Sequence, residues 1–278
     1  MENKRRLDVL MVERKLADTR EKARMYIKSG WVKAAGKTKT KPGEFVAADE
    51  AISLNFEREP YVSRGGVKLE KALVTFGIDL TGKVCIDIGA STGGFTDCML
   101  RSGAKTVYAI DVGSGQLDNG LRQDDRVISH ENTDIREFSG MPGFPSQNFP
   151  ADFAAVDVSF ISLRLVLPSV KPLIARGGSV VVLVKPQFEA GRENIQKRGI
   201  VKDEKAHKEV LETVITGAAE IGLYAQGLEY SPSISKGENK NIEFLLHLKL
   251  SAPQTTINRT RIETVIKEAK NIAKERLN

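Results

Sequence analysis

The feature that most constrains the fold is a glycine-rich turn directly after a short apolar run. Val84–Ile88 is rich in β-forming residues and is apolar except for Asp87, and Gly89, Gly93 and Gly94 follow it. A helical pattern begins near the last glycine, so the stretch predicts a strand, a tight turn and a helix, the first unit of an open α/β sheet. Ligands bind at the carboxyl ends of such strands, where glycines let them approach the backbone closely.

The spacing of this turn narrows the class of ligand. It is not the dinucleotide pattern G-x-G-x-x-G, because Ala90 and Ser91 follow Gly89. A second apolar run ends in Asp111 about 20 residues further on, the place of an acid that binds ribose hydroxyls. Together these features favour an adenosine-bearing cofactor and leave nicotinamide dinucleotide and S-adenosylmethionine both open. For a glycine-rich turn alone, a turn without any ligand is the alternative.

The rest of the large domain alternates between strand-like and helix-like segments. The predicted strands are 84–88, 106–111, 127–129, 152–157, 178–184, 224–230 and 241–250, and the predicted helices are 69–76, one from near 94, one from about 162 toward 173, 204–221 and 259–277. Three prolines and two glycines within 139–150 predict a loop. Alternating units that close with an antiparallel pair predict an α/β fold with a class I Rossmann-like methyltransferase sheet.

Positive charge is concentrated at the amino terminus. Residues 1–41 hold 13 Lys and Arg and 5 Asp and Glu, so this segment carries +8 while the other residues sum to −2. One-sided charge of this kind is typical of nucleic-acid binding, and a solvated charged face is the alternative. With 278 residues, one large domain and one small domain are expected.

The sequence predicts neither a metal site nor a membrane anchor. Cys85 and Cys98 lack C-x-x-C spacing and the three histidines are scattered, so both cysteines are expected in the core. No apolar run approaches the roughly 20 residues that span a bilayer, and no apolar signal-peptide core follows the first methionine. We therefore expect a cytoplasmic protein.

The amino-terminal segment predicts a small module that begins with a helix. A second, capped helix is expected from 18 to 29, with Ala23 and Ile27 facing inward, and short β-like pieces are expected at 44–46 and 51–54, with the lysines of 37–41 on a loop. The basic side chains expected to contact RNA, one of them beyond this segment, are Arg6, Arg20, Arg24, Lys28, Lys33, Lys37 and Arg64.

This segment resembles the S4 RNA-binding domain. The residues that carry the resemblance are 6–8, 19–20, 23, 27 and 30–36. The resemblance implies a fold that grips structured RNA by its phosphates and its shape. A drop in apolar content near 57–60 then divides the chain into an S4-type domain at 1–57, a linker at 58–62 and a large domain at 63–278.

Charged residues follow or enter several of the expected strands. Asp157 ends one strand, Lys185 follows the next, Glu243 lies in a late strand and Lys68 precedes the first. Because strand ends converge at one edge of such a sheet, these side chains are candidates for a single cleft. From spacing alone, a structural ion-pair network is the alternative.

Five segments of the large domain carry a second resemblance: 61–69, 87–97, 111–117, 157–162 and 183–191. They resemble the TlyA-type, or haemolysin A, family of ribosomal RNA ribose 2′-O-methyltransferases. The resemblance implies S-adenosyl-L-methionine as cofactor, ribosomal RNA within ribosomal subunits as partner, and cytidine 2′-hydroxyls as methyl acceptors. It implies no metal and no membrane.

The resemblance also assigns site residues. It matches the family's catalytic Lys-Asp-Lys-Glu tetrad to Lys68, Asp157, Lys185 and Glu243, with Glu238 as the alternative to the last. The cofactor-binding residues it implies are Asp87, Gly89, Ala90, Ser91, Gly93, Gly94, Phe95, Asp111, Val112, Asp134 and Asp157.

Motifs that are missing favour ribose chemistry over base chemistry. Methylation of base amino groups favours a D/N-P-P-Y/F turn after the fourth strand, and residues 157–160 read Asp-Val-Ser-Phe instead. Neither cysteine is placed for cytosine C5 chemistry. Two other classes remain as alternatives: a membrane-active haemolysin, which the family's older name suggests, and a non-catalytic ribosome-binding assembly factor.

Overall fold

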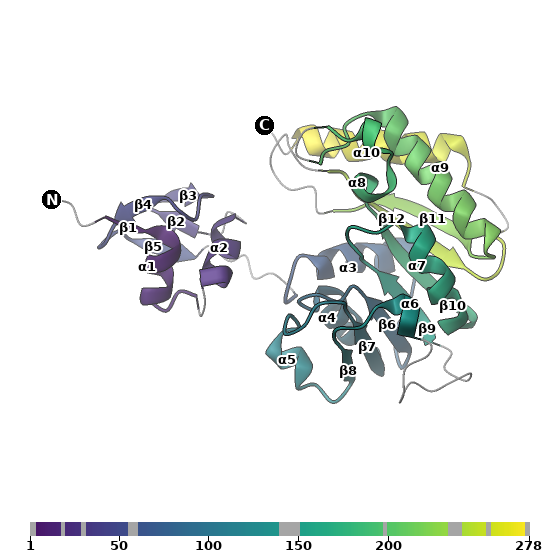
Figure 1. Cartoon of the computed structure of the whole chain (residues 1–278), viewed down its shortest axis with the longest axis horizontal. Coiled ribbons are helices and arrows are strands. Elements are labelled where there is room, and N and C mark those ends of the chain that lie inside the picture. The colour runs from purple at the N-terminus through teal and green to yellow at the C-terminus, as the bar shows by residue number, and fades with distance from the viewer. Residues whose placement is uncertain are drawn as a thin grey trace. The chain divides into compact units, whose positions relative to one another are not determined.

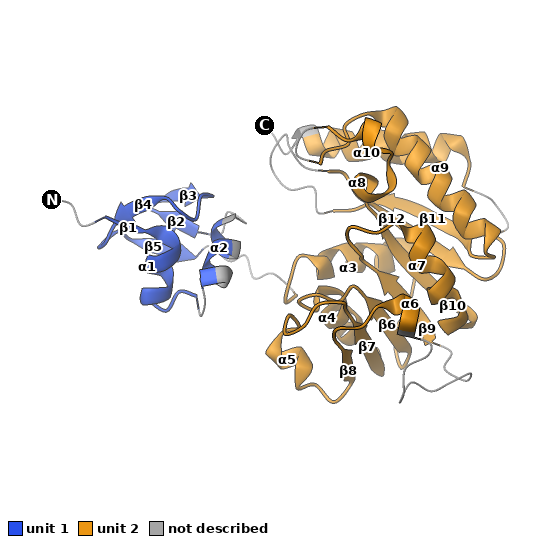
Figure 2. Cartoon of the chain, viewed as in Figure 1, with its two compact units in different colours: residues 1–59 blue, residues 60–278 orange. Residues whose placement is uncertain are grey.

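A computed structural model divides the chain into two compact units, Met1–Glu59 and Pro60–Asn278 (Figure 2). The structure describes residues 4–17, 20–28, 32–54, 61–138, 151–196, 199–232, 241–253 and 257–275. Most of the predicted linker, 58–62, the helix cap at Asp18 and the loop at 139–150 lie outside these ranges. The domain boundaries given above therefore stay a prediction.

The first unit combines two helices with short strands around one small core. Its elements are β1 (Lys4–Arg6), α1 (Leu7–Glu13), α2 (Arg20–Lys28), β2 (Val32–Ala34), β3 (Lys37–Lys39), β4 (Phe45–Ala47) and β5 (Ile52–Leu54). β1 pairs with β4, and β2 lies between β3 and β5, all antiparallel. Leu7, Met11, Ala23 and Ile27 are fully buried, so the inward face predicted for the second helix is confirmed.

The expectation that residues 37–41 form a loop is wrong for the first three of them. Ala34 pairs with Lys37, and the two residues between them have positive φ, 52° at Ala35 and 72° at Gly36. Two successive residues of this conformation make the tight hairpin turn whose twist matches that of the flanking strands. The turn therefore folds Lys37–Lys39 back onto β2 as a strand.

A seven-stranded sheet organises the second unit (Figure 1). Its strands are β6 (Val84–Ile88), β7 (Thr106–Ile110), β8 (Val127–His130), β9 (Ala151–Val156), β10 (Ile174–Val184), β11 (Tyr224–Tyr230) and β12 (Phe244–Lys249). Their order is β11-β12-β10-β9-β6-β7-β8, and β12 runs antiparallel to both of its neighbours. The strands from β6 to β10 pair in parallel, so the predicted Rossmann-like fold class is confirmed.

Helices cover both faces of this sheet (Figure 1). They are α3 (Gly65–Phe76), α4 (Gly94–Arg101), α5 (Asn119–Arg122), α6 (Ile135–Phe138), α7 (Leu163–Val170), α8 (Pro186–Glu189), α9 (Glu204–Glu220) and α10 (Arg259–Glu275), with short 3-10 turns at Lys171–Leu173 and Arg192–Asn194. Ile86 and Ile88 of β6 pack with α7, α9 and α10, whereas Cys85 packs with α3 and α4. Because successive side chains of a strand point to opposite faces of the sheet, the strands contribute to a separate hydrophobic core on each face.

Helix α3 begins four residues earlier than the sequence predicts, at Gly65 rather than Leu69. Gly66 packs so closely on Tyr61 that an added Cβ would lie 2.2 Å from the ring. Glycine has a low helix propensity, so the sequence predicts that the helix starts only after Gly65 and Gly66. The earlier start places Lys68 in the first turns of the helix.

The central strand β9 offers a test of the packing. Phe153→Ala should lower the free energy of unfolding of the second unit by about 3–5 kcal/mol, because Phe153 is fully buried and its removal leaves a cavity. The control, Phe160→Ala, removes a ring that is 90% exposed and should change this free energy by less than about 0.5 kcal/mol. Urea unfolding followed by far-ultraviolet circular dichroism measures both, and equal losses would contradict the assigned core.

Candidate active site

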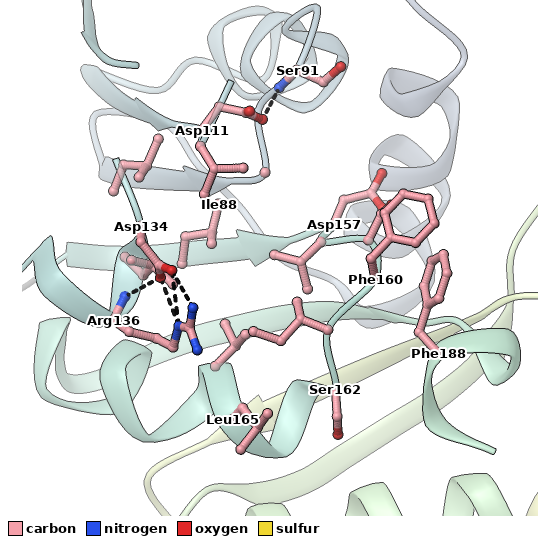
Figure 3. Close-up of a pocket in the computed structure, with 18 of the residues that line it drawn as sticks. Ile88, Ser91, Asp111, Asp134, Arg136, Asp157, Phe160, Ser162, Leu165 and Phe188 are labelled. Atoms are coloured by element: carbon pink, nitrogen blue, oxygen red, sulfur yellow. Dashed lines mark hydrogen bonds and ion pairs between the residues drawn. The ribbon is translucent and has the colours of Figure 1, made fainter. Parts of the chain in front are cut away.

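A cavity of about 1170 Å³ opens at the carboxyl ends of the parallel strands. The chain runs from β6 out to β7 and β8, then returns to β9 on the other side of β6, so the strand order reverses between β6 and β9. Ligands of open α/β sheets bind at such a reversal. The predicted cofactor residues that line the cavity are Gly89, Ser91, Asp111, Val112, Asp134 and Asp157 (Figure 3).

Gly89 lets the two strands at this reversal approach each other. It has φ +83°, and a Cβ at this position would lie 2.6 Å from the carbonyl oxygen of Asp157. Only glycine fits a backbone that is both left-handed and in contact with a neighbouring strand end. Gly89 also lines the cavity, so its backbone is accessible to a ligand there.

Five other predicted cofactor residues do not line the cavity. They are Asp87, Ala90, Gly93, Gly94 and Phe95. Phe95 is 3% exposed and packs in the core, and Gly93 lies against Leu117 and Leu121. These residues shape the turn from β6 into α4, and their direct contact with a cofactor stays a prediction.

Asp87 is a fully buried carboxyl under this turn. Thr96 Oγ1 donates a hydrogen bond to its Oδ2 at 2.6 Å, while Oδ1 has no hydrogen-bond partner among the described residues. Burial raises the pKa of Asp87 to about 7, which the Thr96 hydrogen bond opposes. The hydrogen bond joins the end of β6 to the first turn of α4, so Asp87 holds the glycine turn in place.

Asp111 fixes two loops at the end of β7. Its Oδ2 accepts a hydrogen bond from the Ser91 amide at 2.8 Å, and its Oδ1 accepts one from the Gly113 amide at 2.7 Å. Figure 3 shows the bond to Ser91 across the mouth of the cavity. Each carboxylate oxygen has a further lone pair, so Asp111 can still accept hydrogen bonds from ligand hydroxyls.

Asp134 also lines the cavity and forms an ion pair with Arg136, a residue that the sequence does not single out. Arg136 binds both of its oxygens, with Nη2 2.5 Å from Oδ2, and these hydrogen bonds hold the pKa of Asp134 below its usual value (Figure 3). Asp134 therefore stays ionised, and Arg136 itself lines the cavity.

The four tetrad positions form two ion pairs, which we call the charged row: Lys68, Asp157, Lys185 and Glu243. Lys185 Nζ lies 2.6 Å from Asp157 Oδ1 and donates a hydrogen bond to Ser159 Oγ at 2.9 Å. Lys68 Nζ donates to Glu243 Oε2 at 2.7 Å. All four side chains are at most 20% exposed.

Strand register brings these pairs to one edge of the sheet. Val182 of β10 pairs with Val156 of β9, and Val184 pairs with Phe244 of β12. Asp157, Lys185 and Glu243 each occupy the position next to one of these paired residues, on three neighbouring strands. Glu238, the alternative to Glu243, lies outside the described residues.

Two aromatic rings at the cavity were missed by the sequence analysis. Phe160 has φ +65°, is 90% exposed, and its ring centroid lies 4.9 Å from that of Phe188 (Figure 3). A bulky residue in the left-handed region is strained, and such strain clusters at functional sites. Both rings belong to segments that carry the family resemblance, but residue type alone does not show that a phenylalanine is exposed.

The predicted RNA-binding residues fall in several places. Arg6, Arg20 and Arg24 gather around one carboxylate, that of Asp8. Lys33 lies on β2 and Lys37 on β3, while Arg64 immediately precedes α3 in the second unit. The side chain of Lys28 lies outside the described part of the chain.

Within the described ranges, no group of three or more His, Cys, Asp and Glu side chains is arranged to hold a metal ion. None of the helices described there is long and apolar enough to cross a bilayer.

Comparison with known proteins gives two family matches and close relatives. Residues 61–250 match the FtsJ-like methyltransferase family and residues 5–52 match the S4 domain. YqxC of Bacillus subtilis is 51% identical over 245 residues, which cover 88% of this chain and 85% of that protein. The 16S/23S rRNA (cytidine-2′-O)-methyltransferase TlyA of Mycobacterium tuberculosis is 37% identical over 250 residues, which cover 90% and 91%. A solved Streptococcus thermophilus protein, provisionally called a hemolysin, has a TM-score of 0.76 at 45% identity, covering 99% of this chain and 98% of that chain.

The seven-stranded sheet with its antiparallel β12, the glycine turn after β6 and the match to a methyltransferase family together define a methyltransferase that uses S-adenosylmethionine. The chain belongs to the FtsJ-like methyltransferase family, in its TlyA-type group, and carries an amino-terminal S4 domain. The predicted family, class of enzyme and cofactor are confirmed, and RNA is confirmed as the class of partner.

An alanine substitution tests the close contact between the backbones of Gly89 and Asp157, because it adds one methyl group there. Gly89→Ala should weaken S-adenosylmethionine binding by at least about tenfold, because the new Cβ strains the backbone and pushes the end of β9 away. The control is Gly177→Ala, where φ is +98° but nothing lies within 4 Å, so only backbone strain is added. Calorimetric titration compares the two, and equal affinities would contradict the role of the approach.

Proposed function

We propose that this protein transfers a methyl group from S-adenosylmethionine to the ribose 2′-oxygen of a cytidine in ribosomal RNA. The observation that carries the proposal is the charged row: two ion pairs of little-exposed side chains, one of which includes Asp157, a residue that lines the same cavity as Gly89 and Asp111. Family membership and the names of relatives support the choice of substrate.

The cofactor would be held by residues on the loops after β6, β7 and β8. Gly89 and Ser91 offer backbone at the turn, Asp111 accepts hydrogen bonds from ribose hydroxyls, and Val112 and Asp134 lie where the adenine would be placed. Asp87, Ala90, Gly93, Gly94 and Phe95 support the turn from beneath. When bound, S-adenosylmethionine supplies a methyl group on a sulfonium, which is already an excellent donor.

The protein must also activate the methyl acceptor, the ribose 2′-hydroxyl of the RNA. A ribose hydroxyl is a poor nucleophile until its proton leaves, and charge on the oxygen must be stabilised as that happens. Lys185 contacts both Asp157 Oδ1 and Ser159 Oγ, so its Nζ is held in place, and we assign it as the donor that orients and stabilises the oxygen. Asp157 accepts the proton of the ribose 2′-hydroxyl. The ion pair between Lys68 and Glu243 forms the second half of the charged row.

Phe160 and Phe188 suit the recognition of an unpaired base. Enzymes that modify nucleotides within folded RNA take the target out of its stack and receive the base on aromatic side chains. This aromatic pair lines the cavity, with Phe160 exposed and the Phe188 ring centroid 5.9 Å from Lys185 Nζ, so it offers such a face next to the charged row. We assign these two rings to the base of the target cytidine.

The S4 domain supplies affinity for the RNA in this proposal. Its basic residues bind phosphates, the large domain carries the chemistry, and the connection lies at 58–62. We propose intact ribosomal subunits as the substrate and the cytoplasm as the place of reaction, with no metal ion involved.

The chemistry of the product tests the proposal. Methylation of a 2′-oxygen removes the nucleophile that cleaves the neighbouring phosphodiester, so the linkage should resist alkali. Ribosomal subunits from cells that lack the protein are incubated with purified protein and radiolabelled S-adenosylmethionine, and their RNA is hydrolysed in alkali. We expect label in alkali-resistant dinucleotides. Label confined to mononucleotides would mean base methylation and would contradict the assignment of the charged row.

A further inference from the structure

Asp8, in the first turn of α1, lies at the centre of three arginines. Arg6 donates two hydrogen bonds to it, from Nε and Nη2, both at 3.0 Å. Arg20 Nη2 and Arg24 Nε each donate one more at 3.1 Å. The three arginines come from β1 and from two successive turns of α2, and one carboxylate therefore gathers side chains from separate elements.

Asp8 is fully buried, whereas its partners are not. The three arginine side chains are 41%, 46% and 44% exposed, in chain order. The backbone of Asp8 is held as well, because its amide donates to the carbonyl oxygen of Pro42 at 3.1 Å. Hydrogen bonds led by those of Arg6 lower the pKa of Asp8, so the carboxylate stays ionised.

This arrangement differs from a scatter of surface charges. Three guanidiniums and one carboxylate leave two net positive charges on a fixed frame, with part of each guanidinium turned to solvent. A guanidinium has five N–H donors in a planar fork, so one edge can bind Asp8 while others bind an oxyanion. Without Asp8, three like charges would repel one another and their long side chains would sample many rotamers.

We propose that Asp8 is a positioning residue that builds Arg6, Arg20 and Arg24 into one preformed site for a phosphodiester of the RNA. The inference rests on the proposed function for the identity of the ligand, and it adds a role that charge alone does not predict. An acidic residue inside an RNA-binding surface should strengthen RNA binding rather than weaken it.

Asp8→Asn separates positioning from net charge, because it keeps the shape of the side chain and makes the protein more positive. We expect the affinity of the full chain for deproteinised ribosomal RNA to fall by about tenfold, through loss of charge-assisted contacts to a phosphate. The slope of log K against log salt should shrink by about 0.7–0.9, the value of one phosphate contact. Filter binding at several salt concentrations measures both quantities.

Glu13→Gln is the matched control. It also removes one negative charge from the first unit, but Glu13 pairs with Arg5 at the surface and does not touch Asp8. Its affinity should equal or exceed that of the unchanged protein. If Asp8→Asn likewise binds as well as the unchanged protein or better, simple electrostatics accounts for the surface and the proposal is wrong.

A second variant covers the case in which Asp8→Asn does not fold. Arg24→Lys keeps the charge at a half-exposed position, but a single ammonium cannot bridge Asp8 and a phosphate as the fork does. It should lose about fivefold in affinity, and an unchanged affinity would overturn the proposal. Methylation of ribosomal subunits by the unchanged protein is measured alongside. Its absence would count against the proposed function, whereas the RNA affinities of the variants alone decide whether this site exists.

Discussion

The pairing of β10 with both β9 and β12 is the constraint on which the site depends. Because β10 is parallel to β9 and antiparallel to β12, the carboxyl ends of β9 and β10 lie at the same edge of the sheet as the amino end of β12. A one-residue slip would turn each following side chain to the opposite face of the sheet. The apolar residues buried on both faces of β10 oppose such a slip, so the packing of the core holds Asp157, Lys185 and Glu243 in place.

Both units use a carboxylate of low exposure to set the geometry of cations. In the large unit Asp157 and Glu243 each hold one lysine, and in the small unit Asp8 holds three arginines. Lysine and arginine have long, rotamer-rich side chains, so an ion pair that fixes them lowers the entropy lost when the RNA binds. Preorganised charge also costs little reorganisation when a reaction begins. In the two proposals made above, the same physical arrangement serves binding in one unit and chemistry in the other.

The sequence predicts the strands of the large sheet and the glycine turn, because hydrophobic runs and glycine spacing are local signals. The family resemblance adds six of the residues that line the cavity. It does not predict the hub at Asp8, since the arginines that meet there come from separate elements. The exposure of Phe160 depends on a positive φ that phenylalanine rarely adopts. Helices α5, α6 and α8 have four residues each, too few for a periodic pattern. The resemblance points to Glu243, but its ion pair with Lys68 of α3 is a tertiary contact that the sequence does not show.

The central claim is that Lys185 acts on the reacting oxygen and not on cofactor binding, and a single-turnover measurement tests it most directly. With saturating cofactor and ribosomal subunits, Lys185→Ala should slow methyl transfer by at least about 100-fold, as expected for loss of a charge-stabilising donor. Affinity for S-adenosylmethionine should stay within about threefold, because binding does not use this interaction. Lys205→Ala, at an exposed lysine on α9, should leave both unchanged. A rate that survives in Lys185→Ala, or a loss matched by loss of cofactor affinity, would contradict the account.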